Sequence, residues 1–224
     1  MAQGKSKVQR TVLILLCLMI VIVGAVVSRI LRTPDSAASV RPAPVVSATQ
    51  EGLQKMGVFV RSQPQVLADF ELTDEYGKSF GNDRFIGQWS LVFLGYTHCP
   101  DVCPTTLALF KKLRDSDSLL AAVQYVLLSA DPVRDTPERL AGYVDYFHSD
   151  FVGLTGSIAG VDRLAKQLNS LFAKVPLENG DYLIDHSANI MIINPAGQYH
   201  GFIRQPHTVE QITTAMQAFI PAVE

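Results

Sequence analysis

Two cysteines, Cys99 and Cys103, are the residues of this sequence whose type and spacing most directly suggest chemistry. They lie in the segment GYTHCPDVCP, residues 95–104, where a short apolar run is followed by a stretch with helical spacing. If residues 99–103 are helical, the two Cα atoms are about 6 Å apart and both side chains lie on one face. Helix N-termini favour thiolates, which are nucleophiles and ligands of soft metals. The pair is therefore predicted to act in redox chemistry or in metal binding.

The spacing of the two cysteines leaves several interpretations open. A disulfide that only stabilises the turn is one of them, although closing so short a loop removes little chain entropy. The separation by three residues is larger than the two-residue separation of a thioredoxin redox pair, and it widens the distance between the sulfur atoms. A wider pair is better suited to hold a metal ion between two thiolates. Thiol exchange and metal binding both remain predictions at this point.

Apolar runs predict the elements that must position this pair. The run SLVFLGY, residues 90–96, has the composition of a strand covered on both faces, and it ends directly before the cysteine segment. Regular structure is expected from near Pro64 onward. Residues 69–73 and 78–80 are expected as two strands of a hairpin, because the turn residues DEYG at 74–77 separate them. The other expected strands are 124–129, 189–193 and 199–203, and the expected helices are one that follows Pro104 and three over 137–148, 158–172 and 208–220. This order predicts an α/β protein with a central sheet, flanking helices and an antiparallel edge.

The N-terminal part of the chain has the pattern of a membrane anchor. Residues 11–28 carry no charge and, as a helix, span about 27 Å, close to the thickness of a bilayer core. A cleaved signal peptide is the alternative, but the apolar run is long for one and no Ala-x-Ala site precedes Arg29. We therefore expect a cytoplasmic segment at 1–10, a transmembrane helix at 11–31, a flexible linker at 32–52 and the folded domain at 53–224.

Charges and the third cysteine limit the class of protein further. The formal net charge is −2 and the basic residues are scattered, which disfavours a nucleic-acid partner. Basic residues are almost equal on the two sides of the apolar run, so charge does not decide its orientation. A single N-terminal anchor usually exports the domain that follows, which places that domain in an oxidising compartment. Cys17 lies within the apolar run and is expected to be a buried thiol rather than a lipid-attachment site.

Three short blocks along the chain resemble the Sco/SenC family. They are YTHCPDVCP at 96–104, SADPVRDTPE at 129–138 and DHSA at 185–188, and they occur in the order found in that family. The resemblance covers about residues 66–222. It implies a thioredoxin-like fold and copper, as Cu(I) or Cu(II), bound by Cys99, Cys103 and His186. It also implies a role in assembling the binuclear copper centre of cytochrome c oxidase.

The same resemblance implies partners and a location. The partner is subunit II of cytochrome c oxidase, which carries the copper centre, and other periplasmic copper chaperones are further expected partners. The location is the bacterial inner membrane, crossed once, with the domain on the periplasmic side.

The implied ligand set agrees with the coordination preferences of copper. Two thiolates select Cu(I), and an imidazole adds a third ligand that also suits Cu(II). His186 lies 83 residues after Cys103, so only the folded chain brings them together. In thioredoxins this position carries a proline beside the redox pair, and no proline occurs at 185–189 here. An exposed loop imidazole is the alternative interpretation of His186.

Other polar residues near the first and third blocks are not assigned as ligands. Asp185 is left out because adjacent residues of a strand point to opposite faces. His98 is a weak candidate, since its side chain neighbours Cys99 in a turn and can equally face solvent. Solvated surface positions are expected for His148, His200 and His207.

The second block has two interpretations. Thr136 is a good N-cap, Pro137 suits the first helical position and Glu138 suits the first turn, which together favour a structural role. The functional alternative is that Asp131, at the end of a strand beside the cysteine strand, contributes charge near a metal or a docking face.

Four functions follow from these patterns. A membrane-anchored copper metallochaperone with thiol–disulfide redox activity is favoured by Cys99, Cys103 and His186 together. A thiol–disulfide oxidoreductase without copper delivery is the alternative favoured by the fold, with the two cysteines as the catalytic redox pair. A thiol peroxidase is disfavoured because Thr97 stands two rather than three residues before Cys99. A structural zinc site is disfavoured because three ligands are expected where closed sites use four.

Overall fold

The computed structural model describes residues 19, 23, 50–116 and 118–220. The predicted cytoplasmic segment at 1–10 lies outside these residues, as does the predicted transmembrane helix at 11–31 apart from Met19 and Val23. The predicted linker is described only from residue 50 onward. Within the described residues, no helix is both long enough and apolar enough to cross a membrane.

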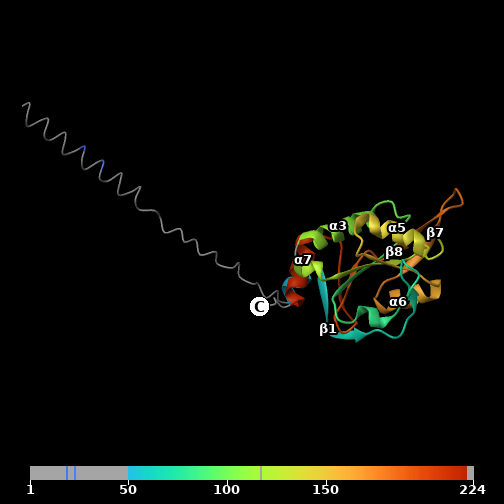
Figure 1. The fold of residues 1–224 in the computed structure, drawn as a ribbon, viewed down its shortest axis with the longest axis horizontal. Helices are drawn as coiled ribbons and strands as arrows, with labels where there is room; N and C mark the ends of the chain where they lie inside the picture. Colours follow the sequence, from blue (N-terminus) through green and yellow to red (C-terminus); the bar gives the residue numbers. More distant parts are fainter. Residues whose placement is uncertain (1–18, 20–22, 24–49, 117, 221–224) are drawn as a thin grey trace, which may run out of the picture. The chain divides into compact units, whose positions relative to one another are not determined.

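A six-stranded mixed sheet forms the centre of the described domain (Figure 1). The strands, in their order across the sheet, are β1 Val58–Val66, β10 Gln198–Ile203, β9 Ile190–Ile193, β4 Ser90–Gly95, β5 Gln124–Ser129 and β6 Val152–Leu154. β4, β5 and β6 run parallel, whereas β9 pairs antiparallel with both β4 and β10, and β1 pairs antiparallel with β10. The predicted α/β fold with an antiparallel edge is confirmed.

Helices cover the sheet on both sides. They are α2 Gln50–Lys55, α3 Val102–Ser116, α4 Ser118–Ala121, α5 Pro137–Phe147, α6 Ile158–Gln167 and α7 Val209–Phe219, together with the 3-10 helix η1 Asn82–Phe85. Figure 1 shows α3, α5 and α7 along one side of the sheet and α6 on the other, and α3 packs against both α5 and α7. Thr136, Ser157 and Thr208 cap the N-termini of α5, α6 and α7 by accepting a hydrogen bond from a backbone N–H three residues later.

The strands nearest the cysteine segment are buried along their whole length. Every residue of β4 and β9 is buried, as expected for central strands covered on both faces. Large side chains fill the surrounding core, among them Leu91, Phe93, Phe110 and Tyr125. Burial of one such side chain contributes roughly 1.5–3 kcal/mol. The C-terminal ends of β4 and β5, where the first two sequence blocks begin, are therefore firmly held.

A β-hairpin replaces the end of one predicted helix. The helix predicted over 158–172 is too long, because Asn169 adopts a left-handed backbone with a φ of 55° shortly after α6 ends. The chain then forms β7 Phe172–Pro176, which pairs antiparallel with β8 Tyr182–His186. Leu171, which continues the apolar spacing of the predicted helix, is 64% exposed. Leucine spacing continues the helical pattern past the residue that ends the helix, so periodicity alone misses this boundary.

The fold also begins earlier than the sequence pattern predicts. Regular structure is expected from near Pro64, but α2 precedes this residue and β1 includes it. α2 also begins inside the segment expected as a linker. β1 is an edge strand whose register with β10 shifts between Val60 and Gln65. Pro64 lies in this interrupted stretch, where a strand tolerates a residue without an N–H. The irregular, half-exposed pattern of β1 explains why it has no clear sequence signal.

The predicted N-terminal hairpin is present but short. β2 Leu72–Thr73 pairs antiparallel with β3 Ser79–Phe80. The Asp74 carboxylate accepts a hydrogen bond from the Lys78 N–H at 2.8 Å, and Gly77 has a φ of 77°. The turn chemistry read from the sequence is therefore confirmed.

Candidate metal centre

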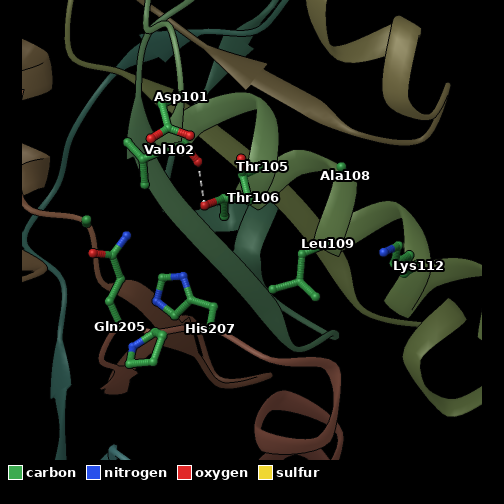
Figure 2. A pocket seen from close by; sticks show the side chains of 11 residues that line it. Asp101, Val102, Thr105, Thr106, Ala108, Leu109, Lys112, Gln205 and His207 are labelled. Carbon is green, nitrogen blue, oxygen red and sulfur yellow. Dashed lines mark hydrogen bonds between the residues drawn. The ribbon is translucent and has the colours of Figure 1, made fainter.

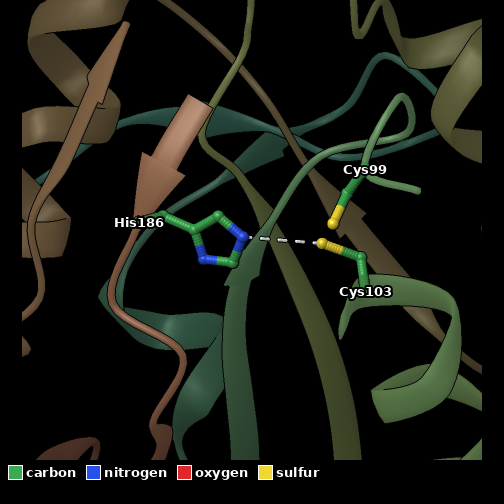
Figure 3. A group of neighbouring side chains, drawn as sticks. All are labelled: Cys99, Cys103 and His186. Atoms are coloured by element: carbon green, nitrogen blue, oxygen red, sulfur yellow. Dashed lines mark hydrogen bonds between the residues drawn. The ribbon is translucent and has the colours of Figure 1, made fainter. Parts of the chain in front are cut away.

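Three side chains from two distant segments of the chain meet beside the C-terminal end of β4 (Figure 3). They are Cys99, Cys103 and His186, and their donor atoms all lie within 4.8 Å of one another. Cys103 Sγ lies 3.7 Å from His186 Nε2. Both cysteines carry free thiols. The three residues of the predicted ligand set therefore form one cluster.

The two cysteines occupy different local structures. Cys103 is the second residue of α3, whereas Cys99 lies in the preceding turn, where its N–H donates to the Tyr96 carbonyl oxygen at 3.2 Å. The helical geometry considered for residues 99–103 is thus present only from Val102 onward. Cys103 is buried and Cys99 is half-buried. Cys99 is therefore the more accessible of the two sulfur atoms.

The end of β4 leaves room for the Cys103 sulfur. Gly95 is the last residue of β4, and a Cβ atom built there would lie 2.9 Å from Cys103 Sγ. The same atom would lie 3.0 Å from a ring carbon of Phe93 and 3.1 Å from a methyl carbon of Leu127. Side-chain carbons do not approach this closely without a shift, so glycine lets α3 bring Cys103 against the strand.

His186 is the last residue of β8, and aromatic rings hold its imidazole. Its ring packs edge-on against Phe93 and Tyr96, with ring centroids 5.8 and 5.9 Å away. Its Nδ1 lies 3.2 Å from the Ser187 carbonyl oxygen. If Nδ1 carries the proton and donates to this carbonyl, the lone pair of Nε2 faces Cys103 and is free to bind a metal.

The two sulfur atoms differ in protonation. A hydrogen bond from Cys103, together with smaller contributions from His186 and backbone N–H groups, lowers the pKa of Cys99 to about 4 in spite of partial burial. The contact with Cys99, followed by burial, raises the pKa of Cys103 far above its usual range. At neutral pH the pair therefore consists of a Cys99 thiolate and a Cys103 thiol.

A buried carboxylate fixes the start of the cysteine turn. Asp135 is fully buried and accepts hydrogen bonds from the Thr97 N–H at 3.1 Å, the Thr97 hydroxyl at 2.6 Å and the Ser129 hydroxyl at 2.7 Å. Arg139 Nε donates to the Thr97 hydroxyl oxygen at 3.0 Å. These bonds tie the turn that carries Cys99 to the end of β5. The structural interpretation of the second block thus agrees with its contacts.

Several polar residues near the blocks do not join the cluster. His98 and Asp185 are exposed, and the donor group formed by described residues does not include either of them. His200 and His207 are half-buried rather than solvated as predicted, and burial lowers the pKa of both. His148, also half-buried, stacks on Phe151 at 5.4 Å. These positions come from packing across distant segments, which a local sequence pattern does not report.

The residues that shape the cluster were not singled out from the sequence. Gly95 and Tyr96 come shortly before Cys99 in the sequence, and this position was the signal that could have identified them. Phe93 has no local signal, because its contact with the His186 ring depends on the folded chain.

A groove of about 1000 Å³ borders the site on one side (Figure 2). It runs from Asp101 along the first part of α3 to Lys112, and Gln205, Pro206 and His207 line it as well. The Gln205–Pro206 peptide bond is cis. Asp101 and Ala188, which also line the groove, are close in sequence to Cys99 and His186 respectively.

The SCO1/SenC family model matches residues 60–221, which include all three sequence blocks and all three cluster residues. The chain belongs to the SCO1/SenC family. The resemblance to this family found in the sequence is thereby confirmed.

Relatives within the SCO1/SenC family include bacterial and mitochondrial proteins. A Stutzerimonas stutzeri protein with a name that describes copper binding is 35% identical over 156 residues, which cover 69% of this chain and 76% of the relative. The human mitochondrial protein SCO2 homolog is 35% identical over 173 residues, which cover 75% of this chain and 65% of the relative. The match thus spans slightly less than two thirds of the human protein.

Solved SCO1/SenC structures share the fold of the described domain. ScoI of Bradyrhizobium japonicum with copper bound aligns with a TM-score of 0.62 at 32% identity, over 69% of this chain and 99% of that one. ScoI of Arabidopsis thaliana with copper bound aligns with a TM-score of 0.62 at 30% identity, over 69% and 98%. Apo Sco1 of Thermus thermophilus aligns with a TM-score of 0.66 at 29% identity, over 74% and 97%.

Proposed function

We propose that this protein binds copper through Cys99, Cys103 and His186 and helps to assemble the binuclear copper centre of cytochrome c oxidase. The observation that carries the proposal is the meeting of two sulfur atoms and one imidazole nitrogen within 4.8 Å, in a chain of the SCO1/SenC family. Copper-bound structures of two family members support the choice of metal.

The donor set fits copper better than it fits zinc. Two thiolates and one imidazole are soft and borderline ligands, which suit Cu(I) and remain compatible with Cu(II). Closed zinc sites use four protein ligands, whereas the cluster found among the described residues has three. When bound, copper would supply a one-electron redox couple, while the chain's own residues hold the sulfur atoms and the imidazole in place.

The location and partners form part of the same proposal. The uncharged run at residues 11–28 supports a single transmembrane helix at 11–31, with residues 1–10 in the cytoplasm. A linker over 32–52 would let the domain at 53–224 reach a partner near the membrane surface. The proposed partner on the periplasmic side is subunit II of the oxidase, with other periplasmic copper chaperones as further partners.

Copper binding is tested with the full chain in detergent micelles, reduced and free of metal. We expect one copper ion per chain by metal analysis. Replacing Cys99 or Cys103 by Ser should weaken Cu(I) binding by about 100-fold or more, because each change removes a soft donor. His186→Ala should weaken Cu(II) binding more than Cu(I) binding, because Cu(II) prefers nitrogen ligands.

Two matched variants control for unspecific effects. Cys17→Ser removes the third cysteine and His98→Ala removes the imidazole next to Cys99, and both should bind copper as the unchanged chain does. Copper binding that survives in Cys99→Ser, Cys103→Ser and His186→Ala alike would refute the proposed site. In a strain lacking the protein, copper in oxidase subunit II should return with the unchanged chain and not with Cys99→Ser.

Thiol–disulfide exchange is a second candidate function, favoured by the asymmetry of the cysteine pair. The Cys99 thiolate would attack a disulfide of a target, forming a mixed disulfide and releasing one target thiolate. Cys103 would then lose its proton and attack the Cys99 sulfur, closing the Cys99–Cys103 disulfide and releasing the second target thiol. Two electrons pass from the pair to the target.

Exchange activity is measured without copper, on a peptide disulfide from the copper-binding segment of subunit II. We expect Cys103→Ser to accumulate the mixed disulfide with Cys99, because the resolving thiol is missing, and Cys99→Ser to be inactive. An equal rate in Cys99→Ser and the unchanged chain would exclude this function. A peroxidase role gains no support, since the Thr97 hydroxyl is bonded to Asp135.

A further inference from the structure

We propose that Arg134 is a positioning residue for His186, acting through Tyr182 and Tyr96. Arg134 belongs to the turn between β5 and α5, and it touches neither sulfur nor imidazole in the described contacts. Its side chain lies between the hairpin that carries His186 and the turn that carries Cys99. The inference rests on the proposed function only for its effect on copper; the placement of the ring is a property of the metal-free protein.

The hairpin β7–β8 is mostly exposed, and Phe172, Tyr182 and Ile184 are its residues that pack against the core. β7 is exposed along most of its length, and Ile184 is the one residue of β8 that is buried. The Ile184 N–H donates to the Tyr96 hydroxyl at 3.3 Å. At the base of the hairpin, the Ser187 N–H donates to the Leu171 carbonyl oxygen at 2.9 Å. The position of His186 at the end of β8 therefore depends on what else holds the hairpin.

Arg134 supplies that hold through charge and ring contacts. Its Nη1 lies 3.1 Å from Asp181 Oδ1, at the tip side of the hairpin. The guanidinium carbon lies 3.7 Å from the centre of the Tyr182 ring and 5.9 Å from the centre of the Tyr96 ring. A cation over aromatic rings attracts them, so one guanidinium draws β8 and the cysteine turn together. Tyr96 in turn packs against the His186 ring.

Asp131 anchors the arginine to the sheet. Its carboxylate pairs with Arg134 Nε and accepts a hydrogen bond from the Tyr182 hydroxyl at 3.0 Å. Asp131 is 3% exposed and the Arg134 side chain is 18% exposed, so solvent competes little for these contacts. On the hairpin itself, Lys174 Nζ lies 3.5 Å from the Tyr182 ring centre and adds a second cation to that ring.

The arrangement predicts a selective effect on the imidazole side of the site. The sulfur atoms are held by α3 and by the Asp135 bonds to Thr97, which do not involve the hairpin. Loss of the Arg134 contacts should leave the sulfur pair in place and move the His186 ring. Since Cu(II) depends on the nitrogen donor more than Cu(I) does, Cu(II) binding should suffer more.

The test compares Arg134→Gln with Arg163→Gln, which changes an exposed arginine on α6. The first readout is NMR of the metal-free full chain in micelles, through nuclear Overhauser effects between the His186 ring and the rings of Tyr96 and Phe93. We expect these effects to weaken in Arg134→Gln and to persist in Arg163→Gln. The second readout is copper affinity, with about a 10-fold or larger loss for Cu(II) and less than about 3-fold for Cu(I).

A second variant covers the case in which Arg134→Gln does not fold. Tyr182→Leu removes the ring that receives the guanidinium and leaves the Arg134–Asp131 pair intact, so it should weaken the same ring contacts. The double variant Arg134→Gln/Tyr182→Leu should lose no more Cu(II) affinity than the worse single variant, because both act through one contact.

The proposal is overturned if the folded variants keep the His186 ring contacts at full strength. It is also overturned if Cu(I) and Cu(II) affinity fall equally, together with the melting temperature, because that result marks general destabilisation. If the unchanged chain binds no copper, the proposed function fails, and the ring contacts of the metal-free protein still decide the role of Arg134.

Discussion

Cys99 and Cys103 have the same chemistry in isolation but not in the folded chain. Cys99 lies in a turn where it accepts a hydrogen bond from Cys103 and lies near backbone N–H groups, so its pKa falls to about 4. Cys103 is buried against Gly95 and its pKa is raised. The two residues can therefore have different roles in a redox or metal site, with Cys99 as the accessible thiolate and Cys103 as the buried thiol.

Alkylation as a function of pH tests this division in a Cys17→Ser background. Because the pKa of Cys99 is lowered, its thiolate persists as the pH falls from 8 to 6 and is lost only as the pH passes through about 4. Iodoacetamide should therefore modify Cys99 at pH 6 at nearly its pH 8 rate, and it should leave Cys103 unmodified, as read by mass spectrometry. His186→Ala should shift the Cys99 profile to higher pH. A Cys99 profile that rises only near pH 8.5 would contradict the prediction.

At the scale of elements, the site depends on how β4 and α3 meet. The strand ends at Gly95, the turn carries Cys99, and the helix starts at Val102 so that Cys103 lies in its first turn. Asp135, from the turn after β5, accepts hydrogen bonds from Thr97 and thereby restricts the conformation of the cysteine turn. The close contact of Gly95 with Cys103 makes the junction sensitive to one added methyl group.

Gly95→Ala is expected to disturb this junction. A Cβ atom 2.9 Å from Cys103 Sγ forces the helix or the sulfur to move, and overpacking of this kind costs about 1–3 kcal/mol. The melting temperature should fall, and formation of the Cys99–Cys103 disulfide by an added oxidant should slow. Gly142→Ala on α5 is the matched control, since a Cβ atom there meets no atom within 4 Å. It should be neutral or stabilising by about 0.5–1 kcal/mol. Equal behaviour of the two variants would count against the steric argument.

For the whole molecule, the mixed sheet sets which distant segments meet. β9 lies beside β4 in the sheet, so the chain that enters β9 passes the end of the cysteine strand and brings His186 to it. The N-terminal end of β4 is closed differently. There, the His200 ring of β10 packs edge-on against Trp89 and Phe219, with ring centroids 5.1 and 5.0 Å away. Within the described residues its Nδ1 has no hydrogen-bond partner.

Acid should destabilise the domain through this packing. Burial lowers the pKa of His200 and His207 in the folded protein, so the unfolded chain binds more protons below its own pKa of about 6.5. Stability is therefore full above that pH and decreases as the pH falls below it. Thermal unfolding followed by circular dichroism should give a lower melting temperature at pH 5 than at pH 7. His200→Phe should reduce this difference, and His98→Gln should not. The same difference in His200→Phe as in the unchanged chain would rule out His200 as its source.

The sequence by itself determined the central strands, most helices, the cysteine pair and the family, because these depend on local periodicity, turn chemistry and short motifs. Continuous apolar runs identify β4 and β5 without reference to the rest of the chain. Only the tertiary structure decided that Cys99 lies outside the helix, that residues 172–186 form a hairpin, and that His200 is packed rather than solvated. It also decided that the His186 ring faces Cys103 and that the two thiols differ in pKa. These properties depend on burial and on hydrogen bonds between segments far apart in the chain, and such contacts leave no periodic pattern in either segment.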